Sequence, residues 1–284
     1  MMQIKKATRK QAKLKLNISS PSGAGKTMGA LLMAKGLVGD WNKIVVIDTE
    51  NGSASLYSHL GDFNTIDLQA PYSPENYIAA IDACLEAKAE CIIIDSASHE
   101  WSGSGGCIEL NEQLAQSKFR GNAWSAWSDT TPRHDSFVNK ILQSPVHVIT
   151  CTRSKMETVM GDDKKVKKLG LKDIQRENWE YELTVSLSID RDTHKAMASK
   201  DRTNLFEGKD PFIITVETGK LIKDWCEQGE PINTAPSPID MSVNILNSCK
   251  TLSELQNAWK TIGTDMQAQA RCIETKEKLK LILK

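Results

Sequence analysis

The sequence lacks long hydrophobic runs, closely spaced cysteines and an excess of charge of either sign. Its apolar runs are too short to cross a bilayer, so we expect no membrane-embedded segment. Seven cysteines are scattered without a CxxC pair, which favours reduced, buried thiols over a disulfide framework or a zinc ribbon. Because Lys plus Arg and Asp plus Glu both number 36, nucleic-acid binding would require local basic patches.

The remaining composition is that of an ordinary globular protein. The chain has 284 residues, of which 40% are hydrophobic and 25% charged. This length allows one large domain and a small appendage. The N-terminal stretch MMQIKKATRKQAKLKL is basic, but no apolar segment of a secretory signal follows it, so we expect a cytoplasmic protein.

Short β-branched runs alternate with helix-like segments, which predicts an α/β fold with a mainly parallel sheet and helices on both faces. The expected parallel strands are 14–19, 43–48, 91–95 and 146–152. The expected helices are 27–37, 74–89 and 132–144. Three later runs are typical of antiparallel strands: 181–190, 194–201 and 211–218.

A change of amino-acid composition after the core predicts a second, smaller domain. The core is expected over 1–228, and the Pro-rich, polar stretch at 229–240 is typical of a linker. In 241–284, Thr251 and Glu254 form a capping-box pattern ahead of a helical apolar face. We therefore expect a small C-terminal helical hairpin.

The stretch SPSGAGKT follows the first expected strand and opens a helix, which is the context of a phosphate-binding P-loop. In such a loop backbone N–H groups surround the phosphates, lysine reaches the terminal phosphates and the hydroxyl binds magnesium. Ser20 replaces the usual first glycine, at a position that makes a turn off the strand. The predicted ATP-binding residues are Ser22, Gly23, Ala24, Gly25, Lys26, Thr27 and Met28.

Two acidic residues lie at the ends of expected neighbouring strands. Asp95 ends CIIID and fits the role of the second magnesium-binding group beside Thr27, although a helix-capping aspartate would have the same pattern. Glu50 follows KIVVID and is a candidate for activating the attacking water, a solvated loop glutamate being the alternative.

With these three motifs in this order, the chain resembles the RecA-like P-loop ATPases. The resemblance implies catalysis by Lys26, Asp95 and Glu50, and places the γ-phosphate sensor at Thr150 or Cys151. More narrowly, HVITCTRSKMET and SKDRTNLF resemble phage-encoded ATP-binding recombination proteins of the single-strand annealing group. That resemblance implies ATP and Mg²⁺ as cofactors, a homo-oligomeric ring or filament, and the cytoplasm of a host cell.

The resemblance also implies contacts with a neighbouring subunit and with single-stranded DNA. Lys200, Arg202 and Arg153 are candidates for a cation that acts on a neighbour's ATP, surface turns being the alternative for the first two. DNA would bind two loops, roughly 96–131 and 154–180, through basic and aromatic side chains. The candidates are Lys118, Arg120, Trp124, Lys164, Lys165, Lys167 and Lys168.

Some of these features have ordinary structural alternatives. Trp127 is better explained as a core anchor than as a base-stacking side chain. For GDDKKVKK, a solvated hairpin tip is the alternative to DNA binding. The resemblance predicts a DNA-dependent ATPase that promotes annealing or strand pairing, with a C-terminal hairpin suited to a recombination or single-strand-binding protein partner. A ring-shaped helicase motor, or an assembly or loading factor without its own grip on DNA, are the alternative functions.

Overall fold

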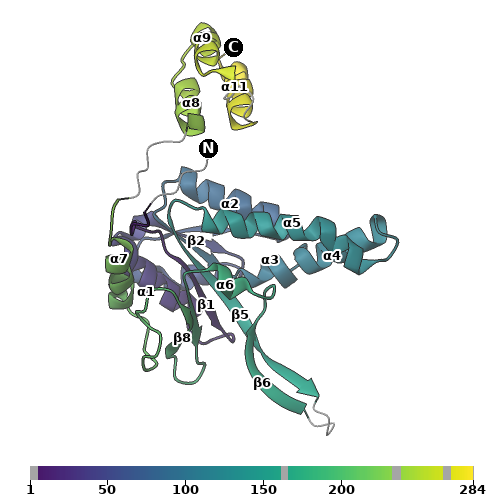
Figure 1. Cartoon of the computed structure of the whole chain (residues 1–284), viewed down its shortest axis with the longest axis vertical. Coiled ribbons are helices and arrows are strands. Elements are labelled where there is room, and N and C mark those ends of the chain that lie inside the picture. The colour runs from purple at the N-terminus through teal and green to yellow at the C-terminus, as the bar shows by residue number, and fades with distance from the viewer. Residues whose placement is uncertain (1–5, 161–165, 232–237, 265–269, 284) are drawn as a thin grey trace. The chain divides into compact units, whose positions relative to one another are not determined.

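The computed structural model describes residues 6–160, 166–231, 238–264 and 270–283 (Figure 1). The chain divides into two compact units, Met1–Glu230 and Pro231–Lys284, which are described separately. In the described part of the chain, none of the helices has the length and apolar character needed to cross a membrane.

A mainly parallel sheet of eight strands forms the centre of the first unit, as the sequence predicted. The strand order is β3-β2-β4-β5-β1-β7-β8, and β6 pairs with β5 outside this path. The strands are β1 (Lys15–Ser20), β2 (Ile44–Asp48), β3 (Asn64–Asp67), β4 (Cys91–Asp95), β5 (His147–Met160), β6 (Val166–Asp173), β7 (Val185–Ile189) and β8 (Ala196–Asp201). The pairs β7–β8 and β5–β6 are antiparallel.

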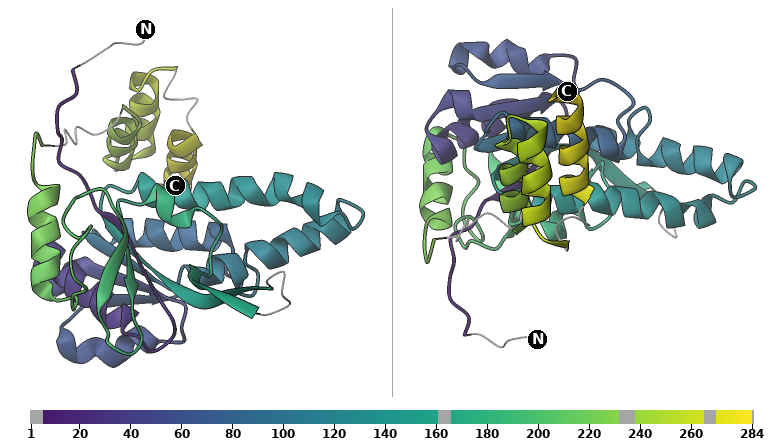
Figure 2. Two further views of the ribbon diagram at one scale, coloured as in Figure 1. Left: turned by 60° about the horizontal axis from the view of Figure 1, so that its bottom comes forward. Right: turned by 90° about the horizontal axis from the view of Figure 1, so that it is seen from above.

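Helices cover both faces of this sheet, because alternate strand residues point to opposite sides and both sets are apolar (Figures 1 and 2). Val46 and Ile93 pack toward α1 and α7, whereas Ile47 and Ile94 pack toward α2 and α5. The helices are α1 (Lys26–Val38), α2 (Pro74–Glu86), α3 (Ser98–Ser102), α4 (Cys107–Ser117), α5 (Ala123–Leu142), α6 (Trp179–Glu182) and α7 (Val216–Cys226), with 3-10 turns at Trp41–Lys43 and Ser53–Leu60.

Three segments differ from the sequence prediction. The run 211–218 is not a strand: it makes one isolated bridge to Ala196, and α7 begins at Val216 after a capping box of Thr215 and Thr218. The first predicted DNA-binding loop, 96–131, is mostly helical, because α5 begins at Ala123 and continues through Pro132. As a result α4 and the first half of α5 extend away from the sheet as a helical pair (Figure 1). The second predicted DNA-binding loop, 154–180, contains regular structure as well, because β5 continues to Met160 and pairs with β6 as a hairpin.

The second unit contains three described helices, one more than the predicted hairpin. They are α8 (Pro238–Asn247), α9 (Leu252–Thr261) and α11 (Ala270–Ile282). The N-cap Thr251 accepts a hydrogen bond from the Glu254 N–H at 3.2 Å. In a capping box the Glu254 side chain would accept from the Thr251 N–H, but here it accepts from the N–H of Lys250, one residue earlier. A small core of Leu246, Leu255, Ile262 and Cys272 holds the helices together.

His147 at the start of β5 makes folding sensitive to mild acid. Its Nδ1 accepts a hydrogen bond from the Leu14 N–H at 3.1 Å, and burial, followed by nearby lysines, lowers the pKa of the ring to about 3. The unfolded chain therefore binds a proton near pH 6.5 that the native chain does not, so the free energy of unfolding falls as the pH falls. Between pH 7 and pH 5 this loss should be about 2 kcal/mol.

We expect His147→Asn, which keeps an acceptor oxygen near the position of Nδ1, to remove this component. Urea unfolding of both proteins at pH 7, 6 and 5 measures it, since other titrating groups are common to both. Parallel pH dependences of the two unfolding free energies would contradict the assignment.

Candidate nucleotide-binding site

The loop between β1 and α1 has the backbone of a phosphate-binding loop. Gly23 and Gly25 have φ values of +82° and +98°, which glycine adopts without strain, and a Cβ at either position would meet no described atom within 4 Å. α1 begins immediately afterwards at Lys26, so its free N–H groups face the loop. Ser20 belongs to the extended strand β1, so the missing first glycine is not required there.

Lys26 closes the mouth of this loop. Its Nζ donates to the carbonyl oxygens of Ser20 and Pro21 and to Ser20 Oγ, each at 3.3 Å. These contacts are longer than the usual charge-assisted hydrogen bond. A phosphate in the loop would offer the ammonium group shorter, charged partners.

Thr27 and Asp95, the two predicted magnesium ligands, are in contact beside the same loop. Thr27 Oγ1 donates to Asp95 Oδ2 at 2.5 Å, although the two residues are 68 positions apart in the sequence. Asp95 is 2% exposed, and its Oδ1 has no hydrogen-bond partner among the described residues. Burial raises the pKa of this carboxyl to about 6. A buried carboxylate oxygen without a partner, beside a hydroxyl, fits the all-oxygen ligand preference of Mg²⁺.

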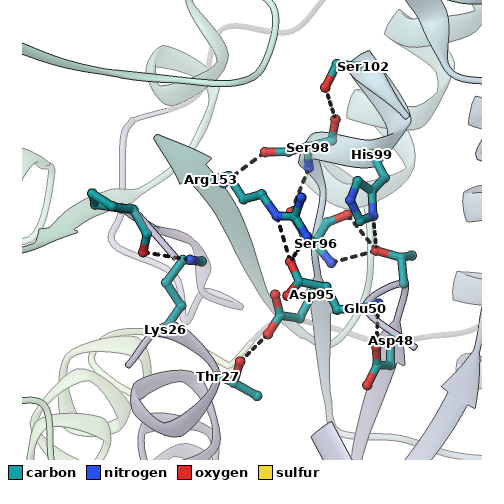
Figure 3. Close-up of polar contacts among 12 residues, drawn as sticks. Lys26, Thr27, Asp48, Glu50, Asp95, Ser96, Ser98, His99, Ser102 and Arg153 are labelled. Atoms are coloured by element: carbon teal, nitrogen blue, oxygen red, sulfur yellow. Dashed lines mark hydrogen bonds and ion pairs between the residues drawn. The ribbon is translucent and has the colours of Figure 1, made fainter. Parts of the chain in front are cut away.

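Asp48, the last residue of β2, holds Glu50 near Asp95 (Figure 3). The group formed by Lys26, Thr27, Glu50, Asp95 and Arg153 is called the crevice below. Asp48 accepts hydrogen bonds from the N–H groups of Glu50 at 2.6 Å and Ala54 at 2.7 Å, which fixes the turn after the strand. Glu50 Oε1 in turn accepts from Arg153 Nε and Nη2, both at 2.9 Å (Figure 3). The acid predicted to activate water is therefore ion-paired within its own chain.

A sequence model of the family described as "AAA domain" matches residues 12–212, which include every residue of this crevice. The chain belongs to the AAA domain family. No curated protein matches the chain. Membership of this family, together with the loop geometry, indicates an ATP-binding ATPase.

The two residues predicted to sense the γ-phosphate lie inside the sheet. Thr150 and Cys151 are fully buried within β5, and Thr150 Oγ1 donates to Asn17 Oδ1 at 2.9 Å inside the sheet. β5 lies between β4 and β1, and its register places Cys151 beside Asp95 and Arg153 beside Ser20. Arg153 is thus the polar residue of β5 at the level where the neighbouring strands β1 and β4 end.

Sequence reasoning missed the residues that join the two acidic strand ends. Thr49 Oγ1 accepts a hydrogen bond from the Ser96 N–H at 2.9 Å and lies 2.8 Å from His99 Nδ1. Burial, and then the charge of Arg153, lowers the pKa of His99. Asp48 could have been found, because it ends the apolar run IVVI as Asp95 ends CIII. His99 had no such signal.

Met28 borders an apolar cavity of about 170 Å³ beside the P-loop. Ile213 and Ile214 form the opposite wall, and His194 Nδ1 lies 3.1 Å from the carbonyl oxygen of Ala24. The cavity lies next to the loop that would hold the phosphates. Ser22 is exposed on the loop, whereas Ala24 is buried.

Lys200 and Arg202, two of the predicted trans-acting cations, lie on or just after β8, several strands away from Asp95 and Glu50. Lys200 Nζ donates to the carbonyl oxygen of Glu180 at 2.9 Å, and Arg202 Nη2 to that of Tyr181 at 3.0 Å, so both hold α6 in their own chain. Their action on a neighbour's ATP stays a prediction. Arg153, by contrast, lies beside the acids of its own chain through its contact with Glu50, and its action on a nucleotide also stays a prediction.

Five of the predicted DNA-binding residues lie in the described part of the chain, on the two projections. Lys118, Arg120 and Trp124 lie at the far end of the α4–α5 pair, where Trp124 is 87% exposed and Lys118 pairs with Asp129 at 2.5 Å. Lys167 and Lys168 lie on β6, opposite β5. Lys164 and Lys165 lie outside the described residues.

A cavity of about 700 Å³ lies between the first half of α5 and the segment 175–178, which follows β6. Trp101, Trp124, Trp127 and Arg176 are among the residues that line it. Trp127 stacks on Trp101 with ring centroids 5.4 Å apart, so it anchors the helical pair and is not a fully free aromatic face.

Proposed function

We propose that this AAA domain is a magnesium-dependent ATPase that assembles on single-stranded DNA and promotes annealing or strand pairing. The observation that carries the ATPase part is the contact of Thr27 with Asp95, whose second oxygen is buried without a described partner. Exposed Trp124, beside Lys118 and Arg120, supports the DNA part, because indole faces and cations are what a single strand requires.

Each residue of the crevice has a separate role in the proposed hydrolysis. The N–H groups of the loop and the Lys26 ammonium group bind and orient the phosphates. Magnesium, held by Thr27 and Asp95, would supply positive charge to the β- and γ-phosphate oxygens. Glu50 accepts the proton of the attacking water once it no longer shares its Oε1 with Arg153.

Arg153 has a second partner available when nucleotide is present. Its β-strand register places its backbone beside Ser20, at the start of the P-loop. A guanidinium group that leaves Glu50 for the γ-phosphate would both release the base and stabilise charge on the transferring group. Glu50 would in this way become active only when the phosphate is in place.

ATP turnover with and without single-stranded DNA tests the proposal. We expect DNA to stimulate turnover and to remain bound at moderate salt, with affinity falling steeply as salt rises. Trp124→Ala should weaken DNA binding roughly 5- to 150-fold, as expected for loss of one stacked base, while leaving turnover without DNA unchanged. Leu281→Ala, which also removes an exposed apolar side chain, is the matched control.

Three outcomes separate the possible functions. ATP turnover that ignores DNA, in a protein that does not bind a single strand, would support a loading factor and contradict the DNA part. Directional strand displacement would support a helicase motor. No ATP turnover under any of these conditions would contradict the proposal as a whole.

A further inference from the structure

Three buried side chains that can each bind a metal converge at the base of the α4–α5 pair. They are Glu100 on α3, Cys107 at the first residue of α4 and His134 in the middle of α5. Glu100 and Cys107 are fully buried, and His134 is 3% exposed. The three residues span 34 positions of sequence, so no short-range motif marks them.

All three side chains meet at one oxygen atom. Glu100 Oε1 lies 3.0 Å from Cys107 Sγ and 3.0 Å from His134 Nδ1, and the three ligand atoms all lie within 4.8 Å of one another. Zn²⁺ binds sulfur at about 2.3 Å and nitrogen or oxygen at about 2.0–2.2 Å, so tetrahedral ligands lie roughly 3.3–3.6 Å apart. The two separations from Glu100 Oε1 are shorter than this by about 0.3–0.6 Å, and the third, between Cys107 Sγ and His134 Nδ1, is at most 4.8 Å, so small side-chain shifts would admit an ion.

We propose that Glu100, Cys107 and His134 form a binding site for a divalent transition metal ion of the zinc type. A thiolate with an imidazole selects zinc over magnesium or calcium, which prefer oxygen ligands alone. One thiolate and one carboxylate also balance the two charges of the ion, so the buried unit is neutral overall. Without an ion, only hydrogen bonds from Cys107, His134 and Gln175 offset the free energy needed to bury the Glu100 carboxylate.

The surroundings of the cluster supply an outer shell of the usual kind. Gln175, in the segment after β6, donates from Nε2 to Glu100 Oε2 at 3.3 Å and to the carbonyl oxygen of Ala97 at 3.0 Å. Such a partner orients a metal-binding carboxylate. The Trp101 ring lies edge-on to His134 with centroids 5.4 Å apart, which fixes the plane of the imidazole.

A metal ion here would tie the helical projection to the strand that carries Asp95. α3 begins three residues after Asp95, and the ion would join α3 to both helices of the pair. A disulfide-free chain would thereby gain a cross-link between segments that are far apart in sequence. The proposal does not depend on ATP hydrolysis or on DNA.

Titration of the full-length, chelator-treated protein with cobalt(II) alone tests the site. A cobalt–thiolate bond absorbs in the near ultraviolet, whereas cobalt at the oxygen ligands Thr27 and Asp95 would not produce this band. We expect the band to saturate at one ion per chain and to disappear when zinc(II) is added. The metal content of the protein purified without chelator should show the same stoichiometry.

Variants assign the ligands. Cys107→Ser should abolish the thiolate band, whereas Cys84→Ser, which changes another buried thiol on α2, should leave the band and the affinity unchanged. Gln175→Ala should lower the cobalt affinity roughly 10- to 100-fold, as loss of an outer-shell partner does. His134→Gln should lower it further.

Two results would overturn the proposal. One is a wild-type protein that shows no thiolate band and holds no stoichiometric metal, in which case the three residues form a hydrogen-bonded cluster only. The other is a band that persists in a folded Cys107→Ser protein. If that variant fails to fold, the wild-type titration and His134→Gln still decide the question.

Discussion

Replacing Lys26 with alanine is expected to reduce ATP turnover by roughly 10²–10³-fold, the effect of removing one preorganised charged donor from a transferring group. ATP binding should weaken as well, because the ammonium group lies across the mouth of the loop that holds the phosphates. Turnover measured over a range of ATP concentrations, together with direct ATP binding by calorimetry, separates the two effects.

Lys35→Ala provides the control for this change. Lys35 lies on the same helix, where its Nζ donates to the Gly39 carbonyl oxygen and faces the Trp41 ring at 5.5 Å, outside the nucleotide site. Its loss should leave turnover close to that of wild type, because the side chain contacts Gly39 and Trp41 and lies outside the nucleotide site. Wild-type ATP binding by Lys26→Ala would contradict the assignment of the loop.

The P-loop and the central strands could be predicted from the sequence because their signals are local. Gly23 and Gly25 are needed for backbone conformations set within the loop, and apolar runs such as CIIID are buried on both faces whatever surrounds them. The error at 211–218 has the opposite cause. Its apolar run favours a strand by local preference, but Thr215 and Thr218 cap a helix that packs on α1.

Contacts between distant segments could not be predicted in the same way. Glu50 and Arg153 are 103 residues apart, and only the position of β5 between β1 and β4 brings them together. The same applies to Glu100, Cys107 and His134, which three separate helices bring to one point. In each case the sequence contains the residue types, but the strand order and helix packing determine which of them meet.

Replacing Glu50 with glutamine should leave ATP binding intact and lower turnover by roughly 10²–10⁴-fold, the range expected for loss of a general base. The amide keeps an oxygen that can accept from Arg153 and the size of the side chain, so the turn fixed by Asp48 should be retained. Pre-steady-state product formation measures the loss at the chemical step. Glu112→Gln, an exposed change on α4, is the matched control.

The Glu50→Gln background also separates two roles of Arg153. If the arginine acted only by holding Glu50, Arg153→Ala would have no further effect once the base is gone. If it also reaches the γ-phosphate, as its register beside Ser20 predicts, Arg153→Ala should weaken ATP binding in both backgrounds. ATP affinities of the two single variants and the double variant therefore decide whether one cation serves both the base and the phosphate. Equal ATP affinity with and without Arg153 would show that the arginine does not contact the γ-phosphate and acts only through Glu50.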